Sequence, residues 1–327
     1  MNFKIDFVVT WVDGNDPIWQ KKKNKYSGCE VKGMNSVKAY RNWGTFKYWF
    51  RGVEKYAPWV HKIYVVTDNQ KPKWLDLKNS KVQLVNHSEI IDTDALPTFN
   101  SNAIEANVHK IKGLAENFVL FNDDMYIVSK TKPDDFFKDN LPCDIAAISP
   151  IIPLKDGTAN FQVNNTEIIN SYFSKSEIIK STFSLKYGRN LIRTLLQLPS
   201  KFFCGYYEPH LPMSLKKSTF TELWEKESIA LNKTTYSKFR SQNNTNVWLF
   251  REWQLAKGDF YPRNSDHFGK LFTLSENNEN IWKAMHSHKY KVMCINDNLS
   301  LRNIDHVKKD FNKNFSELFP KKSEFEK

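Results

Sequence analysis

Short apolar runs alternate with amphipathic stretches in the first part of the chain. Residues 4–11 are rich in β-branched and aromatic side chains and stop near Asp13 and Gly14, which is typical of a buried strand ending in a turn. Large apolar residues recur at three- and four-residue spacing over 46–56, which predicts an amphipathic helix, and 62–67 reads as a second strand. Because a helix between buried strands is the crossover of a parallel sheet, this pattern predicts an α/β fold with a mainly parallel central sheet flanked by helices.

Acidic residues follow two further predicted strands. Asp123 and Asp124 come directly after a strand over 118–121, and Asp297 follows one over 290–295. Ligands of open α/β sheets gather at the carboxyl ends of the strands, so these positions predict a site. Adjacent side chains of an extended segment point to opposite faces, so we expect one of the paired aspartates to face the site and the other to anchor the turn. Such a pair alone is more often a turn former than a metal site, and Asp297 in a similar setting strengthens the metal interpretation.

The pattern changes between residues 156 and 200. This segment is first rich in Ser and Asn and then becomes basic and amphipathic, which predicts a helical insertion or lid on a single domain of residues 1–327. From residue 307 to about 322, lysines alternate with large apolar residues, which predicts a surface helix. That helix would lie at an interface or, as we favour, pack on the protein's own surface.

Composition and charge narrow the classes of partner. The chain has 48 Lys and Arg against 36 Asp and Glu, a formal net charge of +12, so polyanions, phosphorylated substrates and anionic lipid headgroups all suit its surface. The basic residues form short clusters without an arginine-rich arm or a nucleic-acid-binding motif, so nucleic acid is the weakest of these partners. Ten Trp and an aromatic content of 14% offer stacking surfaces for sugars or bases.

The cysteines and the apolar segments indicate a reducing, cytosolic location. Four cysteines, Cys29, Cys143, Cys204 and Cys294, lie far apart without a CxxC pair, which favours reduced structural thiols over a zinc site or a disulfide framework. The N-terminal apolar run comes too early and is too brief for a signal peptide, and no stretch is long enough to span a bilayer. We therefore expect a cytoplasmic protein.

One histidine has a sequence setting that suits catalysis. His210 lies in Glu-Pro-His-Leu-Pro, where the flanking prolines stiffen the backbone and would hold an imidazole in place. Histidine is the usual general base near neutral pH, although a lone histidine between prolines is more often packed or exposed than catalytic. His267, His286 and His288 are alternatives without such support.

Several separated blocks together resemble one protein family. They are IDFVVTWVDGNDPIW (residues 5–19), the segments 39–75 and 96–127 with the sequences KIYVVTDN and FNDD, HLPMSLKKS (210–218), and CINDN (294–298). In this order they look like the four conserved regions of the Stealth family. That family comprises bacterial capsular and cell-surface polysaccharide phosphotransferases and the animal enzyme that adds N-acetylglucosamine-1-phosphate to lysosomal glycans.

The resemblance implies a nucleotide-sugar transferase-like fold and a specific reaction. A hexose- or N-acetylhexosamine-1-phosphate would pass from a UDP-sugar to a hydroxyl of a lipid-linked or polymeric glycan, with release of UMP and formation of a phosphodiester. A divalent ion, Mg²⁺ or Mn²⁺, would neutralise the pyrophosphate.

The resemblance also implies roles for individual residues. The nucleotide would be held by Trp11, Asp13, Gly14 and Arg41, and Asn100 and Ser101 would lie near the donor. Metal and phosphate positioning would fall to Asp123, Asp124 and Asp297. The catalytic residues would be His210 as base, Asp124, and Arg240 as the group that steadies the phosphoryl oxygens.

Two other functions stay open at this stage. A glycosyltransferase would use the same strand-end acids but would release UDP, and a non-catalytic glycan-binding module would use the tryptophans and the positive charge. Acceptor recognition would come from the segment 156–200 or from a partner protein. The positive charge and the amphipathic segments also predict a peripheral position on the inner face of the cell membrane.

Overall fold

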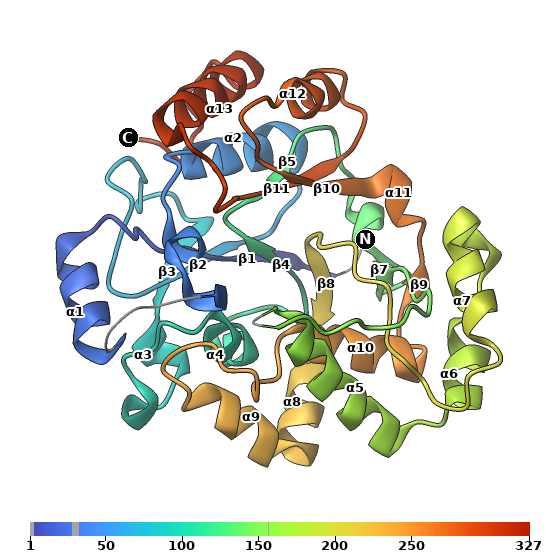
Figure 1. Ribbon diagram of the computed structural model, residues 1–327. Helices are drawn as coiled ribbons and strands as arrows, with labels where there is room; N and C mark the ends of the chain where they lie inside the picture. Colours follow the sequence, from blue (N-terminus) through green and yellow to red (C-terminus); the bar gives the residue numbers. More distant parts are fainter. Residues whose placement is uncertain (1–2, 28–32, 156) are drawn as a thin grey trace.

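A five-stranded sheet forms the centre of the molecule. The computed structural model describes residues 3–27, 33–155 and 157–327 (Figure 1). The strands lie in the order β3 (Val82–Asn86), β2 (Ile63–Thr67), β1 (Ile5–Thr10), β4 (Asn117–Asn122) and β8 (Met213–Lys216). The first four are parallel, and β8 pairs antiparallel with β4 at the edge. The predicted α/β fold with a mainly parallel sheet is confirmed.

Helices cover both faces of this sheet (Figure 1). Above it in the figure lie α2 (Phe46–Tyr56), α12 (Glu279–His286) and α13 (Ile304–Leu318). Below it lie α3 (His87–Ile90), α4 (Ser101–Ala106), α5 (Ala159–Tyr172), α8 (Lys217–Lys226), α9 (Ser228–Thr235) and α10 (Trp248–Lys257). At the periphery are α1 (Pro17–Ser27), α6 (Lys175–Thr182), α7 (Leu191–Gln197) and α11 (Ser265–Phe268). The strand and helix predicted over 62–67 and 46–56 are thus β2 and α2.

The continuous apolar sequence of β1 follows from burial on both sides. Phe7 and Val9 belong to the core on the α2 side, where the Phe7 ring lies 6.4 Å from that of Trp49. Val8 points to the opposite core, which also contains Phe220 from α8. Since successive strand residues face opposite sides, a strand covered on both faces shows an unbroken apolar run instead of an alternating one.

A second, smaller sheet stands beside the carboxyl end of β4. It contains β10 (Gly269–Thr273), β11 (Val292–Asn296) and β5 (Met125–Ile127), in that order. The strand predicted over 290–295 is β11, so it does not join the central sheet. A third sheet joins β6 (Phe137–Lys138), β7 (Leu141–Asp144) and β9 (Tyr261–Pro262). Only the turn at residues 123–124 separates β4 from β5, and this turn connects the first two sheets.

The two segments singled out beyond the central sheet are helical. The predicted insertion begins at Asp156, which lies outside the described residues, and continues through α5, α6, a 3-10 helix (Leu185–Asn190) and α7. Its role as a lid stays a prediction. The C-terminal segment forms α13, and its Phe311 and Phe315 are buried in the same core as α2. The apolar side of α13 is therefore covered by the protein itself.

The described residues also bear on the cysteines and on membrane insertion. Cys143, Cys204 and Cys294 are free thiols, and Cys29 lies outside the described residues. Within the described part of the chain, every helix is too short or too polar to cross a bilayer.

A buried ion cluster fastens the third sheet to α10. Arg251 on α10 is almost fully buried and donates to both carboxylate oxygens of Asp144, at 2.8 and 2.9 Å. Its remaining terminal nitrogen donates to Glu208 Oε2 at 2.9 Å. One guanidinium thus pairs with two buried carboxylates, and loss of the arginine would remove the positive charge that both contact.

We predict that Arg251→Met lowers the free energy of unfolding by about 3–5 kcal/mol, because Asp144 and Glu208 would stay buried without a counter-charge. Urea unfolding followed by circular dichroism measures this loss. The matched control is Arg189→Met, which removes an ion pair with Asp266 from a side chain that is 81% exposed. That variant should lose at most about 1 kcal/mol. Equal losses in the two variants would contradict the role assigned to the buried cluster.

Candidate active site

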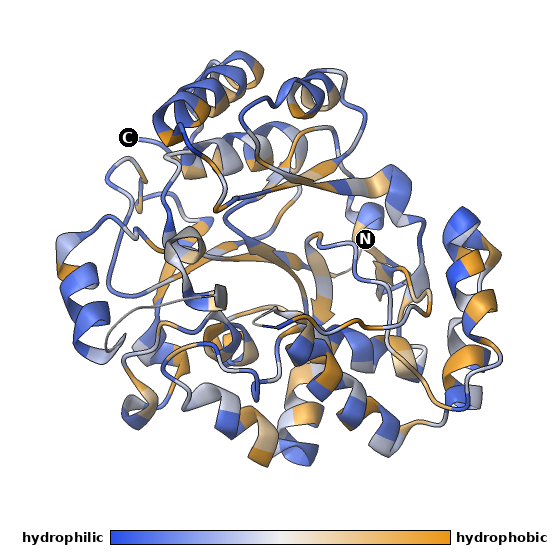
Figure 2. Ribbon diagram, viewed as in Figure 1, coloured by the Kyte–Doolittle hydropathy of each residue, from blue (hydrophilic) through white to orange (hydrophobic). Residues whose placement is uncertain are grey.

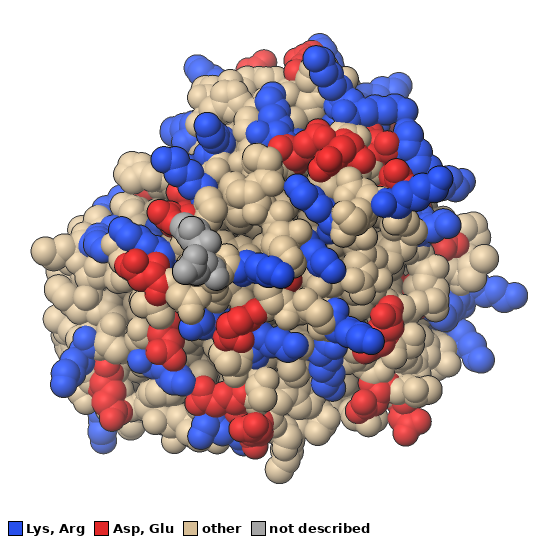
Figure 3. Space-filling view, turned by 180° about the vertical axis from the view of Figure 1, so that it is seen from behind, with Lys and Arg blue, Asp and Glu red and all other residues tan. Residues whose placement is uncertain are grey.

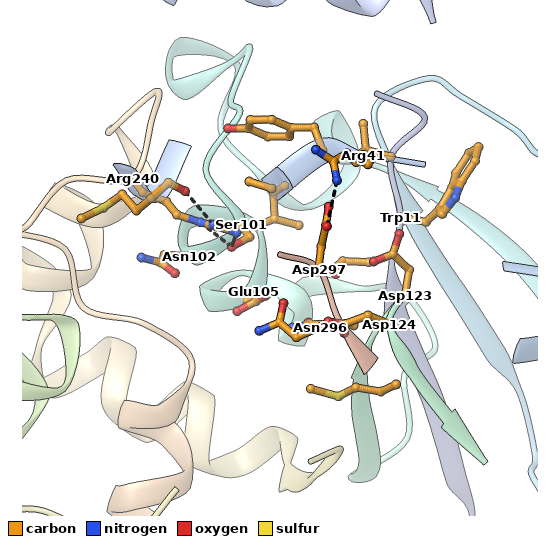
Figure 4. A pocket seen from close by; sticks show the side chains of 18 of the residues that line it. Trp11, Arg41, Ser101, Asn102, Glu105, Asp123, Asp124, Arg240, Asn296 and Asp297 are labelled. Carbon is orange, nitrogen blue, oxygen red and sulfur yellow. Dashed lines mark hydrogen bonds and ion pairs between the residues drawn. The ribbon is translucent and has the colours of Figure 1, made fainter. Parts of the chain in front are cut away.

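One large cavity opens at the carboxyl ends of the parallel strands. Its volume is about 710 Å³, and its wall includes residues that follow β1, β4 and β11. Of the residues predicted from the sequence, those in the wall are Trp11, Arg41, Ser101, Asp123, Asp124, His210, Arg240 and Asp297. Figure 4 shows most of these side chains gathered around the same space. The structure thus brings together residues that are up to 286 positions apart in the chain, from Trp11 to Asp297.

The turn between β4 and β5 brings the acidic residues into the cavity. β5 pairs antiparallel with β11, with Met125 opposite Cys294, and the Ile295 amide donates to the Asp124 carbonyl at 2.9 Å. This pairing places Asp297, directly after β11, beside the turn. Both Asp123 and Asp124 line the cavity, so the expectation that only one would face it is wrong. The reason is that residues 123–124 form a turn and not extended backbone.

Arg41 and Asp297 form an ion pair in the wall of the cavity (Figure 4). Arg41 Nη1 lies 2.9 Å from Asp297 Oδ1, and the Asn298 amide donates to the same oxygen at 2.6 Å. The guanidinium also lies over the ring of Trp43, 5.6 Å from its centroid. Arg41 is therefore held at the cavity by a carboxylate and a ring, where a phosphate oxygen could compete for its donors.

Arg240 lies on the opposite side of the cavity and contacts Ser101 (Figure 4). Its Nε and Nη2 donate to Ser101 Oγ at 3.1 and 2.7 Å, and Nη1 donates to the Met34 carbonyl at 3.0 Å. The Arg240 backbone exchanges two further hydrogen bonds with the side chain of Asn35. These bonds fix the guanidinium beside the first residue of α4, so that two arginines flank the acidic residues.

His210 is held by its backbone and lies close to Asp124. Its φ of 53° is in the left-handed region, and its amide donates to Glu208 Oε1 at 2.8 Å. Glu208 is in turn fixed by Arg251. Side-chain ligand atoms of Asp124, His210 and Cys294 lie within 4.8 Å of one another, and among the described residues this is the only group of three with that spacing. It shares Asp124 with the predicted metal set of Asp123, Asp124 and Asp297.

Three of the predicted substrate-binding residues shape the wall from behind it. Asp13 accepts from the Asn42 side chain at 3.0 Å. Gly14 allows a close approach, because a Cβ there would lie 1.8 Å from the Tyr40 carbonyl oxygen. Asn100 caps α4 and donates to the Ser237 carbonyl at 3.1 Å. Asp13, Gly14 and Asn100 are described residues that do not line the cavity, and direct contact with substrate stays a prediction for them.

Comparison with known proteins identifies the family of this chain. The family model described as Stealth protein CR1, conserved region 1, matches residues 3–28, and that of Stealth protein CR2, conserved region 2, matches residues 39–144. The receptor polysaccharide phosphotransferase WefC of Streptococcus oralis is 53% identical over 99% of both chains. This chain belongs to the Stealth family.

Other relatives agree with this assignment. The capsular polysaccharide phosphotransferase WcwK of Streptococcus pneumoniae is 51% identical over 99% of both chains. The exopolysaccharide phosphotransferase cps2G of Lactiplantibacillus plantarum is 41% identical over 99% of this chain and 97% of its own length. The Stealth protein described here is thus an enzyme that transfers phosphorus-containing groups. Among solved structures, the galactosyltransferase LgtC aligns over 95% of both chains with a TM-score of 0.43 and 10% identity.

In this Stealth protein the pKa values of Asp123 and Asp124 are both raised. Loss of water around Asp123 raises its pKa to about 7, and the neighbouring charge of Asp124 adds to the shift. Burial also raises the pKa of Asp124, which the His210 charge and a hydrogen bond from Cys294 partly offset. Asp124 Oδ1 is buried without a hydrogen-bond partner among the described residues. Closely spaced carboxylates with an unsatisfied oxygen fit a divalent cation, since oxygen ligands are those that Mg²⁺ and Mn²⁺ prefer.

Glu105 is a cavity residue that the sequence analysis missed. It lies on α4 and is buried, and this burial raises its pKa to about 7, with the Asp124 charge adding to the shift and Arg240 opposing it. Figure 4 shows it beside Asn296 and Asp124. The signal was present in the sequence, because Ser101 and Glu105 are four residues apart and so share one face of a helix.

We predict that the free energy of unfolding falls as the pH rises from about 4 to about 7. In the folded protein Asp123 keeps its proton up to about pH 7, whereas an unfolded aspartate loses its proton near pH 3.9. Asp123→Asn cannot titrate, so it should flatten this fall by on the order of 1–3 kcal/mol. Urea unfolding at several pH values measures the slope. The control Asp139→Asn changes an exposed aspartate and should keep the wild-type slope. An unchanged slope in Asp123→Asn would contradict the raised pKa.

Proposed function

We propose that this enzyme transfers a sugar-1-phosphate from a UDP-sugar to a hydroxyl of a glycan and releases UMP. The observation that carries the proposal is the meeting of His210, the carboxylates of Asp123 and Asp124, and the guanidinium groups of Arg41 and Arg240 in one cavity. The relatives described above are polysaccharide phosphotransferases, which supports the transfer of a phosphorus-containing group. The product is a phosphodiester within a cell-surface or capsular polysaccharide.

The size and lining of the cavity suit a nucleotide-sugar. Ligand sites for molecules of this size have volumes of about 300–1,000 Å³, and the cavity has about 710 Å³. Trp11, Tyr40 and Trp43 belong to the wall and supply ring faces for the base or the sugar. Trp11 is fixed in orientation because it stacks on Phe46 with an angle of 7° between the rings. The two arginines supply the positive charge that a diphosphate needs.

A divalent cation fits the acidic side of the cavity. Asp123 and Asp124 would hold Mg²⁺ or Mn²⁺, with Asp297 as a further oxygen ligand. When bound, the cation neutralises the negative charge that grows on the leaving phosphate. It would also favour the ionised form of Asp123, whose pKa is raised to about 7 without it.

Protein groups would carry the transfer itself. The acceptor oxygen bonds to the phosphorus that carries the sugar, and the bond from that phosphorus to the bridging oxygen breaks, so UMP leaves. His210 accepts the proton of the acceptor hydroxyl, and the nearby carboxylate of Asp124 stabilises the imidazolium that results. Arg240, already oriented by Ser101, would steady the phosphoryl oxygens with its planar set of donors.

The proposal also covers the glycan acceptor and the location of the enzyme in the cell. The acceptor is a glycan carried on a lipid or on the growing polymer, and the enzyme works in the cytoplasm at the inner face of the cell membrane. The formal net charge of +12 supports a position beside anionic headgroups. Lys155, Gly157 and Thr158 belong to the cavity wall, which supports a role in acceptor binding for the segment that follows them.

The nucleotide product distinguishes this reaction from ordinary glycosyl transfer. Incubation of the enzyme with a panel of UDP-sugars, the native glycan acceptor and Mg²⁺ or Mn²⁺ should yield UMP by chromatography and a phosphodiester signal by phosphorus NMR. Chelation by EDTA should stop the reaction. UDP as the only nucleotide product would instead establish a glycosyltransferase, because there the bond at the anomeric carbon breaks. Binding of glycan without any nucleotide product would establish a binding module.

We predict that His210→Asn lowers turnover by roughly a hundredfold or more, as expected when a general base is removed. Asparagine is the appropriate replacement, because it tolerates the left-handed backbone that His210 adopts. The Michaelis constant for the donor should change only a few-fold, since the charged groups that hold the diphosphate remain. His286→Asn on α12 is the control and should keep full activity. More than a tenth of wild-type turnover in His210→Asn would reject the base assignment.

A further inference from the structure

The segment that follows the cavity wall ends in an apolar surface at the edge of the molecule. Residues 175–202, here called the arm, comprise α6, the 3-10 helix Leu185–Asn190, α7 and the loop after α7. In Figures 1 and 2 the two helices stand at the right-hand periphery and carry hydrophobic residues along their length. Large apolar side chains that the arm exposes include Leu185, Ile192, Leu195, Leu196, Leu198 and Phe202.

These side chains share a common direction on α7. Ile192, Leu195 and Leu196 follow the three- and four-residue spacing that puts side chains on one face of a helix. They are 57%, 45% and 71% exposed, whereas Thr194 on the other side is buried and accepts a hydrogen bond from the Ile148 amide at 2.9 Å. On α7, Thr194 thus faces inward and Ile192, Leu195 and Leu196 face outward together with Arg193, while Leu191 packs against the core.

Hydrogen bonds hold the arm in this orientation. Lys175 Nζ donates to the carbonyl oxygens of Gln197 and Leu198, at 2.6 and 2.9 Å, and also to that of Ser200. Tyr187 is buried and donates to the Thr182 carbonyl at 2.8 Å. The apolar face is consequently presented by a fixed structure, so little ordering is needed when it binds.

The net positive charge of the arm favours an anionic partner. Residues 175–201 contain six basic residues and one acidic residue, Glu177. Leucine, isoleucine and phenylalanine beside lysine and arginine form the side-chain set of helices that lie in the interface of an anionic bilayer. A second copy of the arm would bring like charges together, and aliphatic side chains offer a glycan neither hydrogen bonds nor ring faces. Basic residues on the rear face are instead scattered among acidic ones (Figure 3).

We propose that the arm docks the enzyme on an anionic lipid surface through the apolar face of α7, with the exposed Lys180 and Lys201 among the headgroups. The inference deepens the membrane-face position proposed above and names the element responsible. Phe161 on α5 lines the cavity and α5 leads into the arm, so the cavity wall and the docking face belong to consecutive segments of the chain.

Vesicle flotation of the full chain tests the proposal. The wild type should float with vesicles that contain about 30% phosphatidylglycerol and stay in solution with phosphatidylcholine alone, and raised salt should weaken binding. Ile192→Ser, Leu195→Ser and Leu196→Ser combined should lower the partition coefficient by roughly tenfold or more. Lys180→Glu with Lys201→Glu should lower it on anionic vesicles as well. The control Ile229→Ser changes a side chain on α9 that is 87% exposed and should bind like the wild type.

Several results would overturn the proposal. They are a wild type that does not float, a triple variant that floats like the wild type, and a wild-type dimer that the triple variant converts to monomer in sedimentation. The changed residues are exposed, so the melting temperature should stay within a few degrees of wild type, and circular dichroism checks this. Flotation does not depend on catalysis, and nucleotide release from a soluble donor and acceptor is measured separately, so failure of docking and failure of the proposed reaction are distinguishable.

Discussion

The hydrogen bond from the Ile295 amide to the Asp124 carbonyl holds β11 of the smaller sheet against the turn that follows β4 of the central sheet. The two-residue turn at 123–124 joins β4 of the central sheet to β5 of the smaller sheet. Since β5 and β11 pair antiparallel, their register decides which residue of the late strand lies beside the turn. A shift by one residue would turn Asp297 away from the cavity and reverse the burial of Cys294. The position of the acidic residues is thus a matter of strand register more than of side-chain packing.

Buried charge is the second constraint on this molecule. Asp123, Asp124 and Glu105 all lie where loss of water raises their pKa, and the cavity wall opposes them with Arg41 and Arg240. Each arginine is oriented by a partner of its own, Asp297 or Ser101. Such a site has an excess of carboxylate oxygens, whose negative charge must be compensated by a cation, a proton or a positively charged ligand.

The two amphipathic regions of the second half of the chain, α13 and the arm, differ in what covers their apolar side chains. α13 buries Phe311 and Phe315 beside Tyr126, with the Phe315 ring 4.6 Å from that of Tyr126, and so completes the core above the sheet. The arm buries Ile178, Tyr187 and Thr194 and leaves Leu185, Ile192, Leu195, Leu196 and Leu198 exposed. Both segments show lysines among apolar residues in the sequence, so periodicity alone does not separate them. The difference is that α13 packs its phenylalanines among core residues of α2, whereas α7 directs Thr194 toward the body of the protein, where it accepts from the Ile148 amide.

The sequence by itself determined the α/β class, the strands β1, β2, β4 and β11, and eight residues of the cavity wall. The apolar runs that stop before Asp13 and at Asn122 mark β1 and β4. The resemblance to the Stealth family points to His210 and Arg240. Only the tertiary structure decided that both Asp123 and Asp124 face the cavity, that Asp13, Gly14 and Asn100 support the wall from behind, and that Glu105 belongs to it. The local sequence pattern predicts whether a residue is buried. It does not predict which residue lies opposite across a sheet or a cavity, because that depends on contacts between segments far apart in the chain, such as Cys294 with Met125. These contacts are set by the packing of the whole molecule.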